Sequence, residues 1–281
     1  MKIAVDHATV YRYAVPVVLE PHVFRLRPRT NSAQRVVAYE LQITPTPAGV
    51  TECLDQDGNL ALNAWFNAPT TELRVRSQFT AEMLRVNPFD YVLIGESLSL
   101  PLGYREPLCT ALAAYRSDAH VSAAVKQYAH TMGPNGDRDV LWFLTELCAR
   151  IFRTFRQLIR PTGSAWASDQ TLHAGEGSCR DLAVLFCDVC RVKGLAARFV
   201  SGYECQSALG GDASMHAWAE VYLPVIGWRG YDPARGLAVS NQHVAVAAGF
   251  HPELAAPVAG RYSGTAASEM KTLLTLRVDH A

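Results

Sequence analysis

The chain has 281 residues, 49% of them hydrophobic and 19% charged, which is enough apolar material for one large globular domain or two ordinary ones. Its 26 basic and 26 acidic residues cancel, so bulk charge gives no reason to expect nucleic acid, an anionic membrane or a polyanionic substrate as a partner. No window approaches the roughly 18 apolar residues of a spanning helix, and no apolar region of a secretory signal follows the N-terminus.

The cysteines predict the compartment. There are seven, an odd number without a framework pattern, at positions 53, 109, 148, 179, 187, 190 and 205. In a chain of this length such an arrangement is typical of free thiols in a reducing environment. We therefore expect a cytoplasmic protein.

The first part of the chain reads as strands. Alternation of β-forming side chains predicts strands at 5–13, 23–28, 36–43, 61–66 and 71–80. Asp57-Gly58-Asn59 is a hairpin signal in this part of the chain. Short strands separated by turn residues predict an antiparallel sandwich-like domain.

The pattern changes after about residue 110. Helical spacing appears at 118–132, 138–158 and 179–193, and Gly194 is the expected C-cap of the last helix. The strands expected after it are 197–205, 216–223, 228–231, 243–247 and 272–278. Helices followed by a run of strands indicate an α+β layout. We place the boundary between 85 and 110, which divides the chain into a β domain, 1–95, and a core, 96–281.

Cys179 is the first candidate for chemistry. Glycines at 175 and 177 allow a sharp turn before it, and an apolar helix begins at once after it. The free N–H groups and the dipole of a helix start favour a thiolate, which is the nucleophilic form of cysteine. The same N–H groups suit the oxyanion of a tetrahedral intermediate. The alternative is a small buried hydrophobic side chain, the common role of a free cysteine.

His216 and Asp232 lie on neighbouring predicted strands. His216 begins an alternating strand, and Asp232 ends the next one because the following proline holds it extended. In a hairpin the end of the second strand lies beside the start of the first. His216 is thus predicted as the base for Cys179, with Asp232 orienting its ring. Taken alone, each residue also fits an ordinary structural role: His216 as a histidine in a strand and Asp232 as an aspartate in a turn.

The segments that carry these residues resemble a known family. The run "GEGSCRDLAVLFCDVCRVKGLAARFVSGY" is similar to the nucleophile helix and next strand of bacterial transglutaminase-like proteins, and "HAWAEVYLPVIGWRGYDP" to their histidine strand and aspartate turn. The segments "HATVYRYAVPV" and "FRLRPR", and the tail "HVAVAAGFHPELAAPVAGRYSG", resemble one bacterial branch that includes cysteine proteases. The resemblance implies a papain-like core of helices packed on an antiparallel sheet, with Cys179, His216 and Asp232 as the catalytic residues.

Three positions depart from that family's usual pattern, namely Arg180 after the cysteine and Ala234 and Arg235 after the Asp-Pro turn. None removes a catalytic candidate. The two arginines suggest the hypothesis that the site favours a substrate bearing a carboxylate.

The predicted reaction is attack of the thiolate on an amide carbonyl to give a thioester. Water would then make the protein a peptidase, isopeptidase or other amidase, which is the outcome we expect; an amine would make it a transglutaminase or acyltransferase. The partners expected are a peptide or protein substrate and, for transfer, an amine acceptor, with no cofactor, nucleic acid or membrane. A non-catalytic peptide-binding module on the same fold is the alternative from another class.

Two further patterns receive structural interpretations. Cys187 and Cys190 have CxxC spacing, but they fall inside the predicted helix, so we expect core packing. A zinc site built on Cys179, His216 and Asp232 lacks an obvious fourth ligand, and we predict no metal.

Other residues leave alternatives open. Trp166, in a loop before the nucleophile, is the candidate for an exposed cleft residue and for a second oxyanion donor. His7, His22, Arg25 and Arg27 belong either to the structure of the β domain or to a partner surface.

Overall fold

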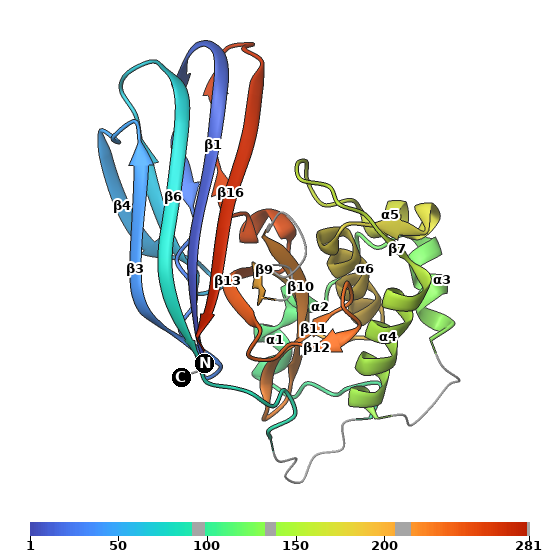
Figure 1. Cartoon of the computed structure of the whole chain (residues 1–281). Coiled ribbons are helices and arrows are strands. Elements are labelled where there is room, and N and C mark those ends of the chain that lie inside the picture. The colour runs from blue at the N-terminus through green and yellow to red at the C-terminus, as the bar shows by residue number, and fades with distance from the viewer. Residues whose placement is uncertain (92–98, 133–138, 206–214, 280–281) are drawn as a thin grey trace.

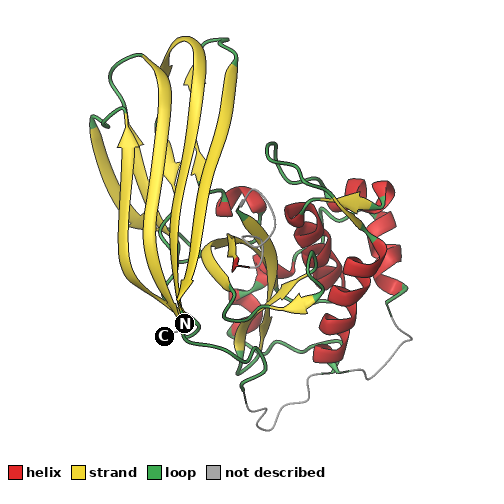
Figure 2. Cartoon of the chain, viewed as in Figure 1, coloured by secondary structure: helices red, strands yellow, loops and turns green. Residues whose placement is uncertain are grey.

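The computed structural model describes residues 1–91, 99–132, 139–205 and 215–279. Long strands form one region of the molecule, and helices with a smaller sheet form the other beside it (Figures 1 and 2). The division predicted after residue 95 falls in a segment outside the described residues and stays a prediction.

The first region is built from two antiparallel sheets. One contains β1 (Lys2–Leu19), β6 (Thr70–Met83) and β3 (Gln34–Thr44), paired in that order. The other contains β2 (His22–Phe24), β5 (Leu60–Trp65) and β4 (Gly49–Leu54). Alternate side chains of both sheets meet in a shared core, as in a sandwich. The predicted hairpin turn is confirmed, with Gly58 at φ +73° between β4 and β5, but β4 was not among the strands expected from the sequence.

The end of the chain returns to this first region. The strand β14 (Val258–Ala259) pairs with β2, and β15 (Tyr262–Ser263) and β16 (Ser268–Asp279) pair with β1. The two ends of the chain therefore lie side by side (Figure 1). The sequence pattern assigned the last strand to the core at 96–281. The pairing of β16 with β1 could not be predicted from local sequence, because the alternation of side chains along a strand is the same whichever strand it pairs with.

The second region has helices on one face of an antiparallel sheet, which confirms the α+β class. The sheet order is β12-β11-β10-β9-β13. Its strands are β9 (Ala197–Glu204), β10 (His216–Leu223), β11 (Gly227–Asp232), β12 (Leu237–Ala238) and β13 (His243–Gly249). The helices are α1 (Leu108–Ala111), α2 (Ala113–Arg116), α3 (Ala123–His130), α4 (Val140–Thr154), α5 (Ser168–Ala174) and α6 (Cys179–Val192), with the short 3₁₀ turn η2 (Pro252–Ala255). A parallel pair, β7 (Arg156–Gln157) and β8 (Glu176–Gly177), lies outside the sheet.

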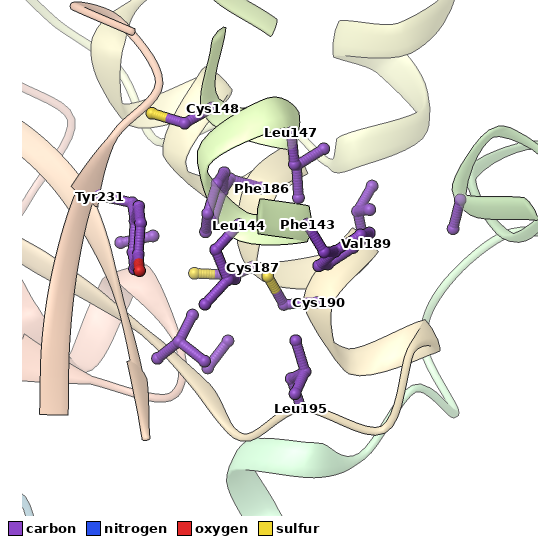
Figure 3. Packing of buried hydrophobic residues seen from close by; sticks show 14 of the residues in the cluster. Phe143, Leu144, Leu147, Cys148, Phe186, Cys187, Val189, Cys190, Leu195 and Tyr231 are labelled. Carbon is purple, nitrogen blue, oxygen red and sulfur yellow. The ribbon is translucent and has the colours of Figure 1, made fainter. Parts of the chain in front are cut away.

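Helix α6 is the centre of this region. It packs against β10, and its apolar residues share a buried core with α3, α4 and β11 (Figure 3). The helix ends at Val192 with Lys193 as its C-cap, and Gly194 follows at φ +77°, in agreement with the end predicted from the sequence. Among the described residues, no helix combines the length and the apolar character needed to cross a membrane.

The first region holds the free edge of strand β13. The amide of Gln34 bonds both backbone groups of Ala245, at 2.8 Å each, and the amide of Asn59 bonds those of Ala248, at 2.8 and 2.7 Å. These two side chains thus replace a neighbouring strand, which satisfies backbone groups that an edge strand leaves unpaired. Beside them, Ile3, Val5, Phe79 and Met83 pack on Tyr203, Val244 and Val246.

Candidate active site

Cys179 is the first residue of helix α6, as the sequence predicted. The chain reaches it through Gly177, where a side chain is excluded because a Cβ atom would lie 2.9 Å from the Cβ of Asp181. Ser178 is the N-cap, and Cys179 is a partly exposed residue. The sulfur therefore lies at the end of the helix whose N–H groups have no partner within the helix.

Asp181 fixes this first turn. Its carboxylate is fully buried and accepts hydrogen bonds from the N–H and the hydroxyl of Ser178, at 2.7 and 2.6 Å. It also accepts the backbone N–H of Trp166, at 2.7 Å, and the guanidinium of Arg160, at 2.6 Å. One carboxylate thus holds the nucleophile turn and the loop before it together. Our sequence reading missed Asp181, although Ser-x-x-Asp before an apolar run is a recognisable capping signal.

His216 and Asp232 meet across neighbouring strands. His216 begins β10, and Asp232 ends β11. The Nε2 atom of His216 lies 2.6 Å from Oδ2 of Asp232, while Oδ1 accepts the N–H of Ala234 at 3.0 Å. Both side chains are buried, with exposed fractions of 6% and 0%. The structure therefore brings together the three residues that the sequence singled out, and their catalytic roles stay a prediction.

The thiol of Cys179 and the imidazole of His216 shift each other's ionisation. Burial alone would raise the pKa of Cys179, but the hydrogen bond and charge of His216, with the N–H of Ala217, outweigh it and lower that pKa. Burial likewise opposes the charge on His216, yet Asp232 and the Cys179 sulfur raise its pKa to about 10. Because Nε2 faces Asp232, Nδ1 is the ring nitrogen left for the sulfur. A thiolate–imidazolium pair follows from these shifts.

Asp232 has a second histidine partner. Burial would raise its pKa, but His216 and His243 keep the carboxyl well below its ordinary value. His243 begins β13, and its Nε2 atom lies 3.0 Å from the same Oδ2 oxygen that His216 contacts. Nothing in the local sequence singles out this histidine, since it comes from a strand whose neighbours are mostly small apolar residues.

These residues also have the side-chain types of a metal site. The ligand atoms of His216, Asp232 and His243 all lie within 4.8 Å of one another. His243 supplies the further ligand type that the sequence lacked for a zinc set. The separations of 2.6 and 3.0 Å are hydrogen-bond distances, so the same atoms form a proton network.

The secondary candidates have structural partners. The backbone N–H of Trp166 is taken by Asp181, and its ring lies under the guanidinium of Arg160 at 4.7 Å. Arg180 donates to the carbonyls of Arg160 and Thr162, at 2.9 and 2.7 Å. These contacts brace the loop of residues 158–166 against α6.

Arg235 and the first-region candidates are engaged as well. Arg235 pairs with buried Glu204 at 2.9 Å, so this guanidinium, like that of Arg180, has an intramolecular role. In the first region, His7 bonds the hydroxyl of Tyr203 at 2.7 Å, and His22 bonds the carbonyl of Glu20 at 2.7 Å. Arg25 pairs with Asp55 at 3.1 Å.

The CxxC cysteines lie in the hydrophobic core, as predicted. Cys187 and Cys190 have exposed fractions of 2% and 0%, and Figure 3 shows their sulfur atoms among Phe143, Leu144 and Leu195. Burial raises the pKa of Cys187 to about 12 and that of Cys190 well above the ordinary value. Neither thiol is suited to nucleophilic chemistry.

Comparison with known proteins identifies the class. Residues 3–82 match the bacterial transglutaminase-like N-terminal region, and residues 144–233 match the transglutaminase-like superfamily. An uncharacterized protein of Mycobacterium tuberculosis is 30% identical over 263 residues, covering 87% of this chain and 82% of the relative. An uncharacterized protein of Mycobacterium leprae is 27% identical and covers 98% of each chain. The chain belongs to the transglutaminase-like superfamily, a family of thiol enzymes.

A solved structure has the same fold along the whole chain. It is titled a "Putative Cysteine Protease" from Cytophaga hutchinsonii, with a TM-score of 0.73 at 20% identity. The similarity covers 100% of this chain and 92% of the other. The combination of β sandwich and transglutaminase-like core is therefore shared by both proteins.

Proposed function

We propose that the protein is a thiol-dependent acyl-transfer enzyme that hydrolyses a peptide, isopeptide or other amide bond. Cys179 is the nucleophile, His216 the base and acid, and Asp232 the residue that orients the ring. The observation that carries the proposal is the 2.6 Å contact of His216 with buried Asp232, together with the lowered pKa of a thiol at a helix start. This is the arrangement that activates a cysteine.

The first half of the reaction forms a thioester. The Cys179 thiolate attacks the amide carbonyl carbon, and the carbonyl oxygen takes up the negative charge. We assign the unpaired N–H groups of the first turn of α6 as the donors that stabilise that oxygen. As the intermediate collapses, the carbon–nitrogen bond breaks, and the proton on Nδ1 of His216 passes to the departing amine.

The second half releases the acyl group. Neutral His216 takes a proton from water, whose oxygen attacks the thioester carbonyl, and the carbon–sulfur bond breaks to leave a carboxylic acid and the thiolate. Water reaches the site because Cys179 is partly exposed. An amine attacking in place of water would give a new amide by the same steps, which is the transglutaminase outcome.

A peptide library tests the proposal. The protein is incubated with the library, with and without a labelled primary amine, and products are followed by mass. We expect cleavage that is lost in C179A and retained in C187A, the matched control from the core of the same helix. Incorporation of the amine instead would assign the transfer reaction. Absence of both products, with an unreactive Cys179, would contradict the proposal and favour a binding module.

We also propose a reducing, cytoplasmic compartment. The support is the set of seven cysteines, all of which are free in the structure. To test this, an alkylating agent is added to intact cells and kept present while the protein is denatured. We expect all seven cysteines to carry the label, because none should be held in a disulfide.

A further inference from the structure

His243 occupies a place in the site that the proposed triad does not explain. Its side chain is 2% exposed, and its Nε2 atom lies 3.0 Å from Oδ2 of Asp232. The same oxygen lies 2.6 Å from Nε2 of His216. One carboxylate oxygen therefore joins two buried imidazoles that come from different strands.

The position of His243 is fixed from several sides. Its ring meets that of Trp218 edge-on, with 5.3 Å between centroids, and lies 6.2 Å from the ring of His216. Its strand pairs with β9 on one side, and on the other Gln34 bonds Ala245 two residues further along. A side chain held this way presents its N–H in one direction.

The hydrogen positions follow from the carboxylate. The pKa of Asp232 is lowered, so the group is ionised and only accepts hydrogen bonds. Both Nε2 atoms must then carry a hydrogen, whatever the charge on each ring. For His216 this leaves Nδ1 free to exchange a proton with Cys179.

We propose that His243 is a positioning residue, which holds Asp232 and limits how strongly this carboxylate binds the imidazolium of His216. This inference rests on the proposed function. An oxygen that accepts two N–H groups is a weaker acceptor for each, so His243 keeps His216 from becoming too poor an acid for the leaving amine. With the Ala234 N–H on Oδ1, it also fixes the plane of the carboxylate.

Other charged groups lie around this pair. Cys179 faces His216 from α6. Glu204 lies opposite His243 on β9 and is paired with Arg235. Beyond His243 is a cavity of about 40 Å³ whose lining includes Arg85, Glu220 and Arg229. These groups are unchanged by substitution at position 243, so a shift in the titration of His216 reports the His243 contact itself.

Two amide variants separate positioning from packing. Glutamine carries its N–H at the place of Nε2 and still reaches Asp232, whereas asparagine carries it at the place of Nδ1 and does not. H243Q and H243N are prepared with ¹⁵N-labelled histidine. Cys179 is blocked as its S-methylthio derivative. The blocked sulfur carries no charge and no longer raises the pKa of His216, so the imidazole titrates at a lower pH than in the free enzyme.

The expected result is a rise of about one pH unit in the pKa of His216 in H243N, with H243Q close to the wild type. Equal titrations in all three proteins would overturn the inference. The ¹⁵N shifts of the wild type give a second measurement that needs no variant: they should show hydrogen on Nε2 of both histidines, and a bare Nε2 on His243 would also overturn it.

Failure of the proposed function looks different. In that case unblocked Cys179 would alkylate like an ordinary thiol, while the titration of His216 in the blocked protein would still respond to H243N.

Discussion

Helix α6 places thiols in two contrasting environments. At its first residue, Cys179 is a partly exposed residue whose sulfur is bonded by His216 and the Ala217 N–H, and its pKa is lowered. Two and three turns further on, Cys187 and Cys190 lie among apolar side chains, and burial raises the pKa of both. One helix therefore carries one thiol with a lowered pKa and two with raised pKa values.

Burial does not distinguish these environments, because it opposes the thiolate in each. The difference is the presence of donors: an imidazolium and a backbone N–H reach Cys179, whereas the neighbours of Cys187 in the core offer mainly carbon. The position along the helix matters since only the first turn exposes unpaired N–H groups. The predictions below remove these features one at a time.

Removal of His216 has the largest expected effect. Without the imidazolium, the pKa of Cys179 should return to or above its ordinary value, which lowers the thiolate fraction at pH 6 by about 100- to 1,000-fold. The rate of alkylation of Cys179 in H216A, followed by mass, measures this. H130A, which changes an exposed histidine at the end of α3, is the matched control and should react like the wild type. A rate in H216A equal to that of the wild type would contradict the account.

The next largest effect is expected in D232N. An asparagine lacks the charge that holds the pKa of His216 near 10, so this pKa should fall by about two units or more. The pKa of His216 is higher in the folded protein than in the unfolded chain. The contact of His216 with Asp232 therefore stabilises the wild type fully below the pKa of an unfolded histidine, about 6.5. This stabilisation is lost as the pH rises through about 10. Urea unfolding between about pH 8.5 and 10, where the thiol of the unfolded chain is also ionised, should therefore show a decline in the wild type that is smaller in D232N. Parallel curves would remove Asp232 from its proposed role.

A third prediction concerns the turn that presents Cys179. D181N removes the charge that pairs with Arg160 and weakens the acceptor of the Ser178 and Trp166 N–H groups. Loss of one partner from a buried pair should lower the free energy of unfolding by about 3 kcal/mol. Proteolysis of the loop 158–166 should also become faster. Urea unfolding and limited digestion measure the two effects, and D169N, near the start of α5, is the control.

The smallest effect is expected at the inert end of the helix. C187S buries a hydroxyl in an apolar core, which should lower the free energy of unfolding by about 1–2 kcal/mol. The alkylation profile of Cys179 should not change, because the two thiols share no partner. A shifted profile would show that the two environments are coupled.

The sequence was sufficient for the features that local patterns encode. The start of α6 after Gly177, its end at Gly194, and the hairpin joining β10 and β11 follow from turn residues and periodicity over a few positions. Those elements alone predicted where Cys179, His216 and Asp232 would meet. Asp181 was within reach as well, since its capping signal is local.

Long-range features were not predictable in this way. The return of β16 to β1, and the contacts of Gln34 and Asn59 with β13, join residues that share no local pattern. His243 reaches Asp232 only because β13 pairs with β9, two strands away from β11. The same limit explains why Arg180 and Arg235 read as substrate contacts, whereas the structure gives them partners within the chain.

The most direct test compares the thiols of α6 within one native protein. Wild-type protein is alkylated from pH 5 to 9, and the labelled peptides are quantified by mass. We predict that Cys179 reacts at pH 6 at close to its rate at pH 8, and that Cys187 and Cys190 react only after unfolding. A rate for Cys179 that rises tenfold per pH unit toward about 8.5, as for an ordinary thiol, would contradict the account.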